Sequence, residues 1–391
     1  MRIALVLNSF PKTSETFILN KITELAKRGQ QITVFTHSVN AEVLKLDANF
    51  SKNIEIKQIF GWGNRIKYTI KGLILSINKP SCFSYLKSAN GNIISNLFRL
   101  GVLAELVEYP IVHFEFSGLA VNYFSQIQYL TSKTKVIISC RGSAELIAPL
   151  FHESRKFELI SVLNNVYLVH CVSDHIKQTL VNYGLTNENV KVIRPAINEL
   201  FFNFNPLSRK SHEVFKILMV GRLDWVKGYD LVLIALKKII NQGYLIELSI
   251  IGSGTEEKKL KFLSYVLKID HHVKFLGSKS SVEVKKKLMD SHILLLPSWS
   301  EGISNSAIEA KFSGVAVISA KAGGMEEVLK HKQTGYLTEL GDINGIQEGI
   351  EYFYEHENSR MEIIQNARKD AILNHSLKSQ IDEFEDIYNN I

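Results

Sequence analysis

The stretch from Ile293 to Ala310 is the part of the chain that most constrains the fold. Its first four residues, Ile293–Leu296, form a continuous apolar run, as a parallel strand buried on both faces requires. Three residues that break strands follow, namely Pro297, Ser298 and Gly302. A helix then begins, and either Ser304 or Asn305 can cap it. Strand, sharp turn and helix start together predict a βα unit of a parallel α/β sheet.

The turn of this βα unit is a candidate ligand site. In open parallel sheets, ligands bind outside the carboxyl ends of the strands, where loop N–H groups and a helix N-terminus favour an anion. Glu301 lies in the loop, and Glu309 lies near the second turn of the helix. Two carboxylates beside an anion site are explained if each accepts hydrogen bonds from ligand hydroxyls. The alternative is that both are surface acids on an ordinary βα turn.

The length of 391 residues indicates two domains of roughly 200 residues each. The polar stretch Phe201–His212 has no clear period and is the expected linker between them. On the amino side of the linker, residues 2–8, 17–28 and 31–37 are typical of strand, helix and strand. A βαβ order predicts a parallel sheet in the first domain as well.

The three cysteines, Cys82, Cys140 and Cys171, have no spacing typical of a metal site. Their odd number argues for a reducing compartment and against a disulfide framework, so we expect buried packing residues. The apolar run at residues 1–7 is too short for a signal peptide, and no run approaches the roughly 18 apolar residues of a spanning helix. The sequence therefore predicts a cytoplasmic protein.

The net charge of +7 is unevenly distributed along the chain. Residues 1–206 hold 22 Lys and Arg and 14 Asp and Glu, a net charge of +8, and the remainder holds 24 and 25, a net charge of −1. Residues 51–100 contain eight of the bases and one acid, Glu55. A local basic excess indicates an anionic partner such as a membrane surface, a phosphorylated lipid or a nucleic acid. The alternative is a solvated helix face.

Residues 61–106 are mostly helical in pattern and mix large apolar side chains with Arg65, Lys67, Lys71 and Lys79. This mixture suits an interfacial helix on anionic lipid, and it equally suits a helix packed on the sheet.

Polar side chains follow several predicted strands of the first domain. Candidates on this side are Ser14, Glu15, His113, Glu115 and Arg141. Ser14 either caps the first helix or lines a cleft at the carboxyl end of the first strand. A lone histidine such as His113 is more often a structural residue with satisfied hydrogen bonds than a catalytic one.

Loops after successive strands of the second domain converge on one chemistry. They carry Gly221, Arg222, Lys227, Gly252, Gly254, Glu301, Glu309 and Gly323–Gly324. In a doubly wound sheet these loops lie at one edge. Two cations beside a helix N-terminus suit a diphosphate, and carboxylates suit ribose and sugar hydroxyls. A nucleotide diphosphate sugar is the ligand that needs both.

Two motifs of the second domain resemble the donor signature of a known family. The loop Gly221–Gly228, followed by Glu301 and Glu309 at their spacing of eight, is similar to that of the retaining GT-B glycosyltransferases of the family-4 type. The resemblance runs from about residue 215 to 340. In the first domain, the loop Phe10–Phe17 resembles the subset that builds exopolysaccharide and colanic-acid-type polymers.

The resemblance implies an α/β GT-B fold of two Rossmann-like, doubly wound domains that face a central cleft. Residues 1–205 would bind the acceptor, residues 206–370 would bind the nucleotide-sugar donor, and 371–391 would form a helix that crosses back to the first domain.

The resemblance also implies roles for the site residues. Arg222 and Lys227 would hold the diphosphate, Glu309 the ribose, and Glu301 the transferred sugar. The remaining donor-side residues would be Gly221, Gly252, Gly254, Gly302, Ile303, Ser304, Asn305 and Arg141, and the acceptor-side candidates would be Ser14, Glu15, His113 and Glu115.

Arg141 departs from the family pattern, because many relatives carry a histidine in this loop. One hypothesis is that Arg141 pairs with the carboxylate of a uronic acid donor. The competing interpretations are an extra diphosphate contact and a salt bridge to Glu145.

The expected activity is transfer of a sugar, with retention, to a lipid-linked or polysaccharide acceptor in surface polysaccharide biosynthesis. The sequence has no Asp-x-Asp metal motif in these loops, so we expect neither a metal nor another cofactor, and no nucleic-acid partner. The expected location is cytoplasmic, with peripheral contact to an anionic membrane. The alternatives are a nucleotide-sugar epimerase and a non-catalytic subunit that binds a nucleotide sugar.

Overall fold

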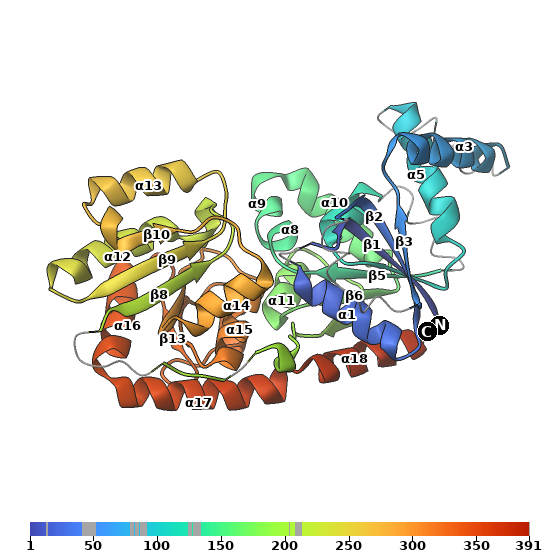
Figure 1. The fold of residues 1–391 in the computed structure, drawn as a ribbon. Coiled ribbons are helices and arrows are strands. Elements are labelled where there is room, and N and C mark those ends of the chain that lie inside the picture. The colour runs from blue at the N-terminus through green and yellow to red at the C-terminus, as the bar shows by residue number, and fades with distance from the viewer. Residues whose placement is uncertain are drawn as a thin grey trace. The chain divides into compact units, whose positions relative to one another are not determined.

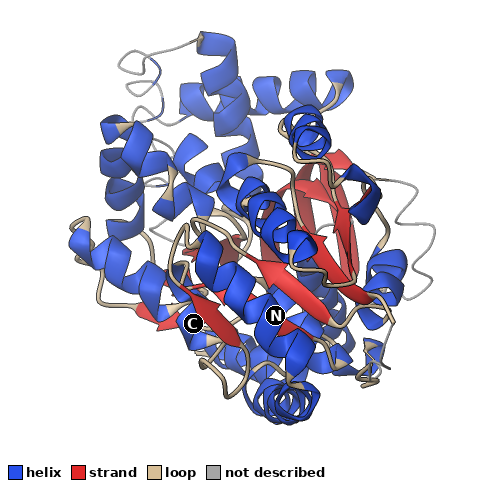
Figure 2. Cartoon of the chain, turned by 90° about the vertical axis from the view of Figure 1, so that its left-hand side faces the viewer, coloured by secondary structure: helices blue, strands red, loops and turns tan. Residues whose placement is uncertain are grey.

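A computed structural model describes residues 1–12, 15–40, 52–78, 82, 86, 92–123, 127, 134–202, 204–207 and 213–390 (Figure 1). The chain divides into two compact units. The first unit is Met1–Ile193 together with Ile381–Ile391, and the second is Arg194–Gln380. Each unit is a parallel sheet with helices packed against it (Figure 2).

The unit boundaries differ from the expected divisions after residues 205 and 370. Residues after Ile193 pack in the second unit: Ile197 forms a bridge with Ser376, and the Asn205 N–H donates to the Ser313 carbonyl at 3.2 Å. Of the expected crossing segment, only 381–391 belongs to the first unit. The expected linker lies partly outside the described residues, at 203 and 208–212.

The first unit contains a seven-stranded parallel sheet in the order β3-β2-β1-β4-β5-β6-β7. Its strands are β1 Arg2–Phe10, β2 Gln31–Val39, β3 Ile54–Gln58, β4 Ile111–Phe114, β5 Lys135–Cys140, β6 Leu168–Cys171 and β7 Val190–Val192. Its helices are α1 Thr16–Lys27, α3 Trp62–Asn78, α5 Ile93–Leu106, α6 Ser117–Asn122, α8 Ser143–Leu146, α9 Ala148–Phe151, α10 Glu153–Asn164 and α11 Asp174–Asn182. Most of α18 (Leu377–Asn389) also packs here.

The second unit contains a six-stranded parallel sheet in the order β10-β9-β8-β11-β12-β13. Its strands are β8 Phe215–Val220, β9 Ile246–Ile251, β10 Val273–Phe275, β11 Ile293–Leu296, β12 Ala316–Ala320 and β13 Tyr336–Thr338. Its α-helices are α12 Tyr229–Asn241, α13 Glu257–Val266, α14 Ser281–Met289, α15 Asn305–Ser313, α16 Ile343–Glu355 and α17 Glu357–Asn374. Its 3₁₀ turns are η1 Glu199–Phe201, η2 Trp225–Lys227, η3 Asp270–His272 and η4 Gly323–Glu327.

The continuous apolar run of β11 is explained by burial on both faces of the second sheet. Ile293 and Leu295 join a core formed with α12 and α16, whereas Leu294 and Leu296 join a separate core formed with α15. Successive side chains of a strand point to opposite faces, so a strand covered on both sides has no polar positions to alternate with. The expected buried parallel strand is confirmed.

Helices α3 and α5 pack against each other at a close crossing in the first unit. A Cβ built at Gly72 would lie 1.8 Å from the Leu97 carbonyl oxygen, and one at Gly101 would lie 1.7 Å from the Tyr68 carbonyl oxygen. Only glycine allows backbones to approach this closely. The crossing fixes which face of α3 turns inward, with Tyr68, Gly72 and Ser76 buried.

Among the described residues, no helix has both the length and the apolar character needed to cross a bilayer. All three cysteines are buried thiols, as the sequence predicts.

Candidate functional site

The loop after β8 is held against the loop after β11 by a close backbone contact. Gly228 has a φ of +63°, and a Cβ at this position would lie 2.3 Å from the Pro297 carbonyl oxygen. A side chain would therefore be both strained and obstructed. The Trp299 N–H donates to the Val226 carbonyl at 2.7 Å, which adds a direct bond between the loops.

This contact brings two predicted site residues together. Lys227 Nζ lies 2.5 Å from Glu301 Oε1, and the Ser298 hydroxyl donates to the same oxygen at 2.8 Å. Both charged side chains remain partly exposed, at 23% and 11%. The charge pair therefore lies in reach of solvent at the carboxyl ends of β8 and β11.

Arg222, the other predicted cation, is 75% exposed, and its Nη2 lies 3.5 Å from Asp224 Oδ2. Its side chain is free to reorient, because an exposed ion pair at this distance contributes little stability.

The loop after β9 packs on the loop after β8 through backbone alone. A Cβ at Gly252 would lie 1.8 Å from the Gly221 carbonyl oxygen, and one at Gly254 would lie 2.3 Å from the Leu223 carbonyl oxygen. Gly252 also has a φ of +145°. The predicted glycines thus let three strand-end loops meet without side chains between them.

Helix α15 begins with open polar groups. Ser304, one of the two predicted capping residues, occupies the N-cap position, but its side chain makes no capping hydrogen bond. The Asn305 side-chain oxygen is buried and has no hydrogen-bond partner in the described part of the chain. Gly302 and Ile303 are buried in the turn before the helix. The N–H groups of Asn305 and Ser306 have no partner in the described part of the chain and are available to an anion, whereas the Ala307 N–H donates to the Ser304 carbonyl at 3.2 Å.

Glu309 has no ion-pair or hydrogen-bond partner for its carboxylate among the residues that the structure describes. Burial raises the pKa of this carboxyl to about 7 because the charged form loses hydration. A partly buried carboxylate without a partner is poised to accept hydrogen bonds from a ligand.

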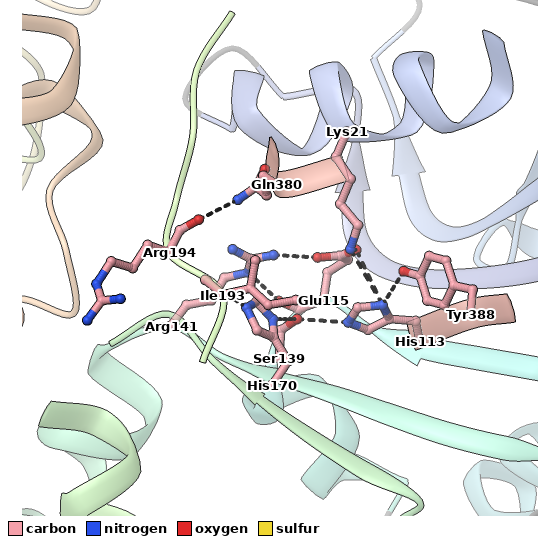
Figure 3. A network of polar contacts seen from close by, with 10 residues as sticks. All are labelled: Lys21, His113, Glu115, Ser139, Arg141, His170, Ile193, Arg194, Gln380 and Tyr388. Atoms are coloured by element: carbon pink, nitrogen blue, oxygen red, sulfur yellow. Dashed lines mark hydrogen bonds and ion pairs between the residues drawn. The ribbon is translucent and has the colours of Figure 1, made fainter. Parts of the chain in front are cut away.

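In the first unit, Glu115 is fully buried between two cations (Figure 3). Lys21 Nζ lies 2.6 Å from Glu115 Oε1, and Arg141 Nη2 lies 2.5 Å from Oε2. Arg141 Nε also donates to the Glu115 carbonyl at 2.9 Å. β4 and β5 are adjacent parallel strands, so the residues that follow them meet at one edge.

Burial and charge act in opposite directions on this cluster. Burial lowers the pKa of Lys21 to about 8, even though Glu115 favours its charged form. Burial alone would raise the pKa of Glu115, but Lys21 and Arg141 hold it well below its usual range. Glu115 therefore stays ionised, since two cations share one carboxylate.

A chain of four hydrogen bonds crosses the same core (Figure 3). Tyr388 hydroxyl lies 2.7 Å from His113 Nδ1, His113 Nε2 lies 2.8 Å from Ser139 Oγ, Ser139 Oγ lies 2.7 Å from His170 Nδ1, and His170 Nε2 lies 2.9 Å from the Ile193 carbonyl. A carbonyl only accepts, so His170 donates from Nε2. Burial lowers the pKa of His170 to about 3 and that of His113 well below its usual range, so both rings are neutral and each has one donor nitrogen and one acceptor nitrogen. Each earlier bond therefore runs in the same direction from Tyr388.

These contacts change the interpretation of the acceptor-side candidates. His113 and Glu115 are 0% exposed, so we assign them positioning roles in place of direct acceptor contact. The hypothesis of a salt bridge between Arg141 and Glu145 is wrong, because the guanidinium pairs with Glu115. The Glu145 carboxylate instead accepts the backbone N–H groups of Arg141 and Gly142.

The other two acceptor-side candidates lie in the loop after β1. Glu15 pairs with Lys12 at 2.6 Å, and Ser14 lies outside the described residues. Because His113 and Glu115 are fully buried, they do not form one exposed site with Glu15.

Sequence reasoning missed four members of the polar network: Lys21, Ser139, His170 and Tyr388. The burial of Lys21 could have been predicted from the sequence. It lies at helical spacing among Ile18, Ile22 and Leu25, on the apolar face that an amphipathic helix turns toward the core. A lysine on an apolar face requires a buried anion.

In the described ranges, no group of three or more His, Cys, Asp or Glu side chains is arranged to hold a metal ion.

Two family profiles match the chain, one in each half. The family described as "Glycosyltransferase Family 4" matches residues 14–199, and the family described as "Glycosyl transferases group 1" matches residues 203–370.

Curated relatives extend over most of the chain. The amylovoran biosynthesis glycosyltransferase AmsK of Erwinia amylovora is 24% identical, over 88% of this chain and 89% of its own length. The putative colanic acid biosynthesis glycosyltransferase WcaL of Escherichia coli is 22% identical, over 94% of this chain and 95% of its own length.

Solved structures share the fold at low identity. Anabaena HepE in complex with UDP and glucose has a TM-score of 0.79 at 17% identity, with full coverage of both chains. Sucrose-phosphate synthase from Thermosynechococcus elongatus has a TM-score of 0.79 at 17% identity, over 100% of this chain and 98% of that one. Two parallel α/β units with these loops and these relatives show that the chain belongs to the family-4 type of GT-B glycosyltransferases, in the subset related to exopolysaccharide and colanic acid enzymes.

Proposed function

We propose that the protein is a retaining glycosyltransferase that moves a sugar from a nucleotide diphosphate sugar to a lipid-linked or polysaccharide acceptor in surface polysaccharide biosynthesis. One observation carries the proposal. Lys227, in the loop after β8, pairs with Glu301 in the turn that leads into α15, and the Glu309 carboxylate on α15 has no partner among the described residues. This combination offers a cation, free N–H groups and two carboxylates to one ligand.

Each group has a proposed role toward the donor. Lys227 and Arg222 bind the diphosphate together with the open N–H groups of α15. Glu309 accepts hydrogen bonds from the ribose, and Glu301 accepts them from the transferred sugar. Without donor, Glu301 pairs with Lys227. When the donor binds, its diphosphate takes the place of Glu301 beside Lys227, and its sugar hydroxyls take the place of Lys227 beside Glu301.

The proposed catalysis is electrostatic. Departure of the diphosphate leaves positive charge on the sugar and negative charge on the leaving group, and fixed cations stabilise the latter. We propose that Lys227 and Arg222 supply this charge and that no metal or other cofactor is needed. Activity retained in excess chelator supports that assignment, and activity restored only by a divalent ion overturns it.

Relatives support the substrate classes. HepE is described in complexes with UDP and with UDP-glucose, which favours a nucleotide sugar as donor. AmsK and WcaL are named for amylovoran and colanic acid biosynthesis, which favours a surface polysaccharide or its lipid-linked precursor as acceptor. We propose that transfer takes place at the cytoplasmic face of the membrane.

A thermal-shift screen against a panel of nucleotide sugars tests the donor class, because a ligand that binds only the native state raises the melting temperature. Transfer assays with the stabilising donor then separate three outcomes. Product formed only with acceptor supports the transferase. Donor converted without acceptor identifies an epimerase. Donor binding without turnover on any candidate acceptor favours a non-catalytic subunit. Anomeric analysis of the product tests retention.

A further inference from the structure

Helix α3 carries a row of exposed apolar side chains that no described element covers. Trp62, Ile66, Ile70, Leu73, Ile74 and Ile77 are each between 45% and 87% exposed. At about 100° per residue, these six positions fall within an arc of about 120° on one side of the helix. Figure 1 shows α3 at the outer edge of the first unit, where α5 lies beside it.

The opposite side of α3 is fixed by the crossing with α5. Tyr68, Gly72 and Ser76 are buried there, and the contact at Gly72 leaves no room for rotation. Ile93 and Ile94 at the start of α5 are also exposed, at 61% and 54%. The packing of α3 on α5 therefore keeps the apolar row on the outer side of α3, although the row itself makes none of these contacts.

Two exposed cations lie near the row. On a helical projection, Lys67 lies about 20° beyond one edge of the apolar arc, and Arg65, in the first turn of the helix, lies about 60° beyond the other edge. Both are exposed, and neither has an ion-pair partner among the described residues. By contrast, Lys57 and Lys71 both pair with Glu105, at 2.9 and 3.0 Å.

We propose that α3 is an interfacial helix that docks the first unit on a bilayer containing anionic lipid. An apolar arc bordered by free cations matches the boundary between acyl chains and anionic headgroups, and an exposed tryptophan such as Trp62 prefers that depth. A second copy of this chain is the less favourable occupant, because an isologous contact would bring the cations of both copies together. The proposal goes beyond sugar transfer, and its test contains neither donor nor acceptor.

Vesicle sedimentation tests the contribution of the cations to membrane binding. The wild-type chain is expected to bind vesicles of phosphatidylglycerol and phosphatidylcholine in equal parts, and to bind pure phosphatidylcholine vesicles weakly. The Arg65→Gln/Lys67→Gln variant should lose about fivefold in partitioning for each cation. High salt should also reduce the binding of the wild type to the anionic vesicles. The matched control is Lys177→Gln/Lys191→Gln, which removes two exposed lysines elsewhere in the first unit and should bind as the wild type does.

A second variant tests the contribution of the apolar row to membrane binding. Ile70→Gln/Ile77→Gln changes two exposed side chains, so the fold is retained, and vesicle binding should fall at least tenfold. Leu150→Gln/Phe157→Gln is the control, since these side chains are equally exposed outside α3. Lipids with brominated chains should quench tryptophan fluorescence in the wild type, and Trp62→Phe should abolish the quenching.

Three results would overturn the proposal: equal binding of the Ile70→Gln/Ile77→Gln variant and the wild type, quenching that survives Trp62→Phe, or no vesicle binding by the wild type. If the wild type instead sediments as a dimer that these α3 substitutions dissociate, the row covers a second copy.

Discussion

The Tyr388 hydroxyl donates a hydrogen bond to His113 Nδ1 at 2.7 Å, so a residue near the end of the chain satisfies a histidine in the fourth strand. This bond is the first of the directed series that ends at the Ile193 carbonyl. It gives α18 a specific place in the core of the first unit. Arg28 adds to the attachment, with ion pairs to Asp382 at 2.5 Å and to Glu385 at 2.8 Å.

Tyr388→Phe should destabilise the first unit by about 1–3 kcal/mol, because the phenyl ring keeps the packing but leaves His113 Nδ1 with only its long contact to Lys21 Nζ at 3.5 Å. Hydrogen exchange of β4 and β5 amides in urea measures the first unit alone. Tyr265→Phe removes an exposed hydroxyl on α13 and is expected to change nothing. Equal protection in Tyr388→Phe and wild type would show that the hydroxyl is not needed.

The buried histidines make the first unit sensitive to acid. His170 has a pKa of about 3, whereas an unfolded histidine titrates near 6.5. Below about pH 6.5, His170 binds a proton in the unfolded chain but not in the folded chain. The free energy of unfolding therefore falls as the pH falls, by about 1.4 kcal/mol per pH unit. Replacing His170 should make the free energy of unfolding less dependent on pH.

Wild type and His170→Asn are therefore compared at pH 7 and pH 5 by urea unfolding of the first unit. The loss of stability over that interval should be about 2 kcal/mol smaller in the variant. His175→Asn, at an exposed position on α11, is the control and should keep the wild-type slope. Parallel profiles for His170→Asn and wild type would contradict a neutral His170 in the folded chain.

Much of the architecture could be predicted from the sequence, because it depends on local patterns. The buried run Ile293–Leu296 and the glycines after β8 and β9 predict the parallel sheet of the second unit and the loops at its edge. Residues whose roles depend on neighbours distant in the sequence were less predictable. The partner of Arg141 is Glu115, 26 residues away on the adjacent strand, and no spacing rule distinguishes it from Glu145. Tyr388 is 275 residues from His113.

The Lys227–Glu301 pair predicts a large kinetic effect. Lys227→Ala should lower turnover by roughly 10²–10³, as expected for the loss of one fixed group that stabilises developing charge. Lys258→Ala, on the exposed face of α13, is the matched control. Because the two side chains touch, Lys227→Ala/Glu301→Gln should lose less than the product of the single losses. Normal turnover in a folded Lys227→Ala protein would remove this lysine from the mechanism.

The raised pKa of Glu309 predicts that nucleotide binding depends on pH. Ribose hydroxyls donate best to the ionised carboxylate, which forms as the pH rises through about 7. UDP affinity should therefore be constant above that pH and fall by up to about tenfold per pH unit below it. Glu309→Gln should bind more weakly with a flatter profile, and titration of the phosphate itself is common to both proteins. A Glu309→Gln profile that parallels the wild type would show that this carboxyl does not titrate with binding.

The last prediction concerns Arg141 and the charge of the donor sugar. Two cations surround Glu115, so the cluster retains one positive charge, which favours an anionic ligand. However, Glu115 already occupies Nε and Nη2, the edge of the guanidinium that would form two parallel bonds to a carboxylate. Arg141 Nη1 has no partner among the described residues, so a uronate would receive a single charged hydrogen bond.

One such bond contributes about 1.5 kcal/mol at the lower end of its range, so a uronate donor should be preferred over its neutral parent by roughly tenfold. The kcat/KM values of both donors are compared in wild type and Arg141→Ala, with Arg155→Ala as a control that removes a partly buried arginine on α10. If Arg141 recognises a carboxylate, its loss lowers kcat/KM for the uronate and leaves the neutral donor nearly unchanged. An equal loss for both donors would instead favour a diphosphate contact, because every nucleotide sugar carries that group.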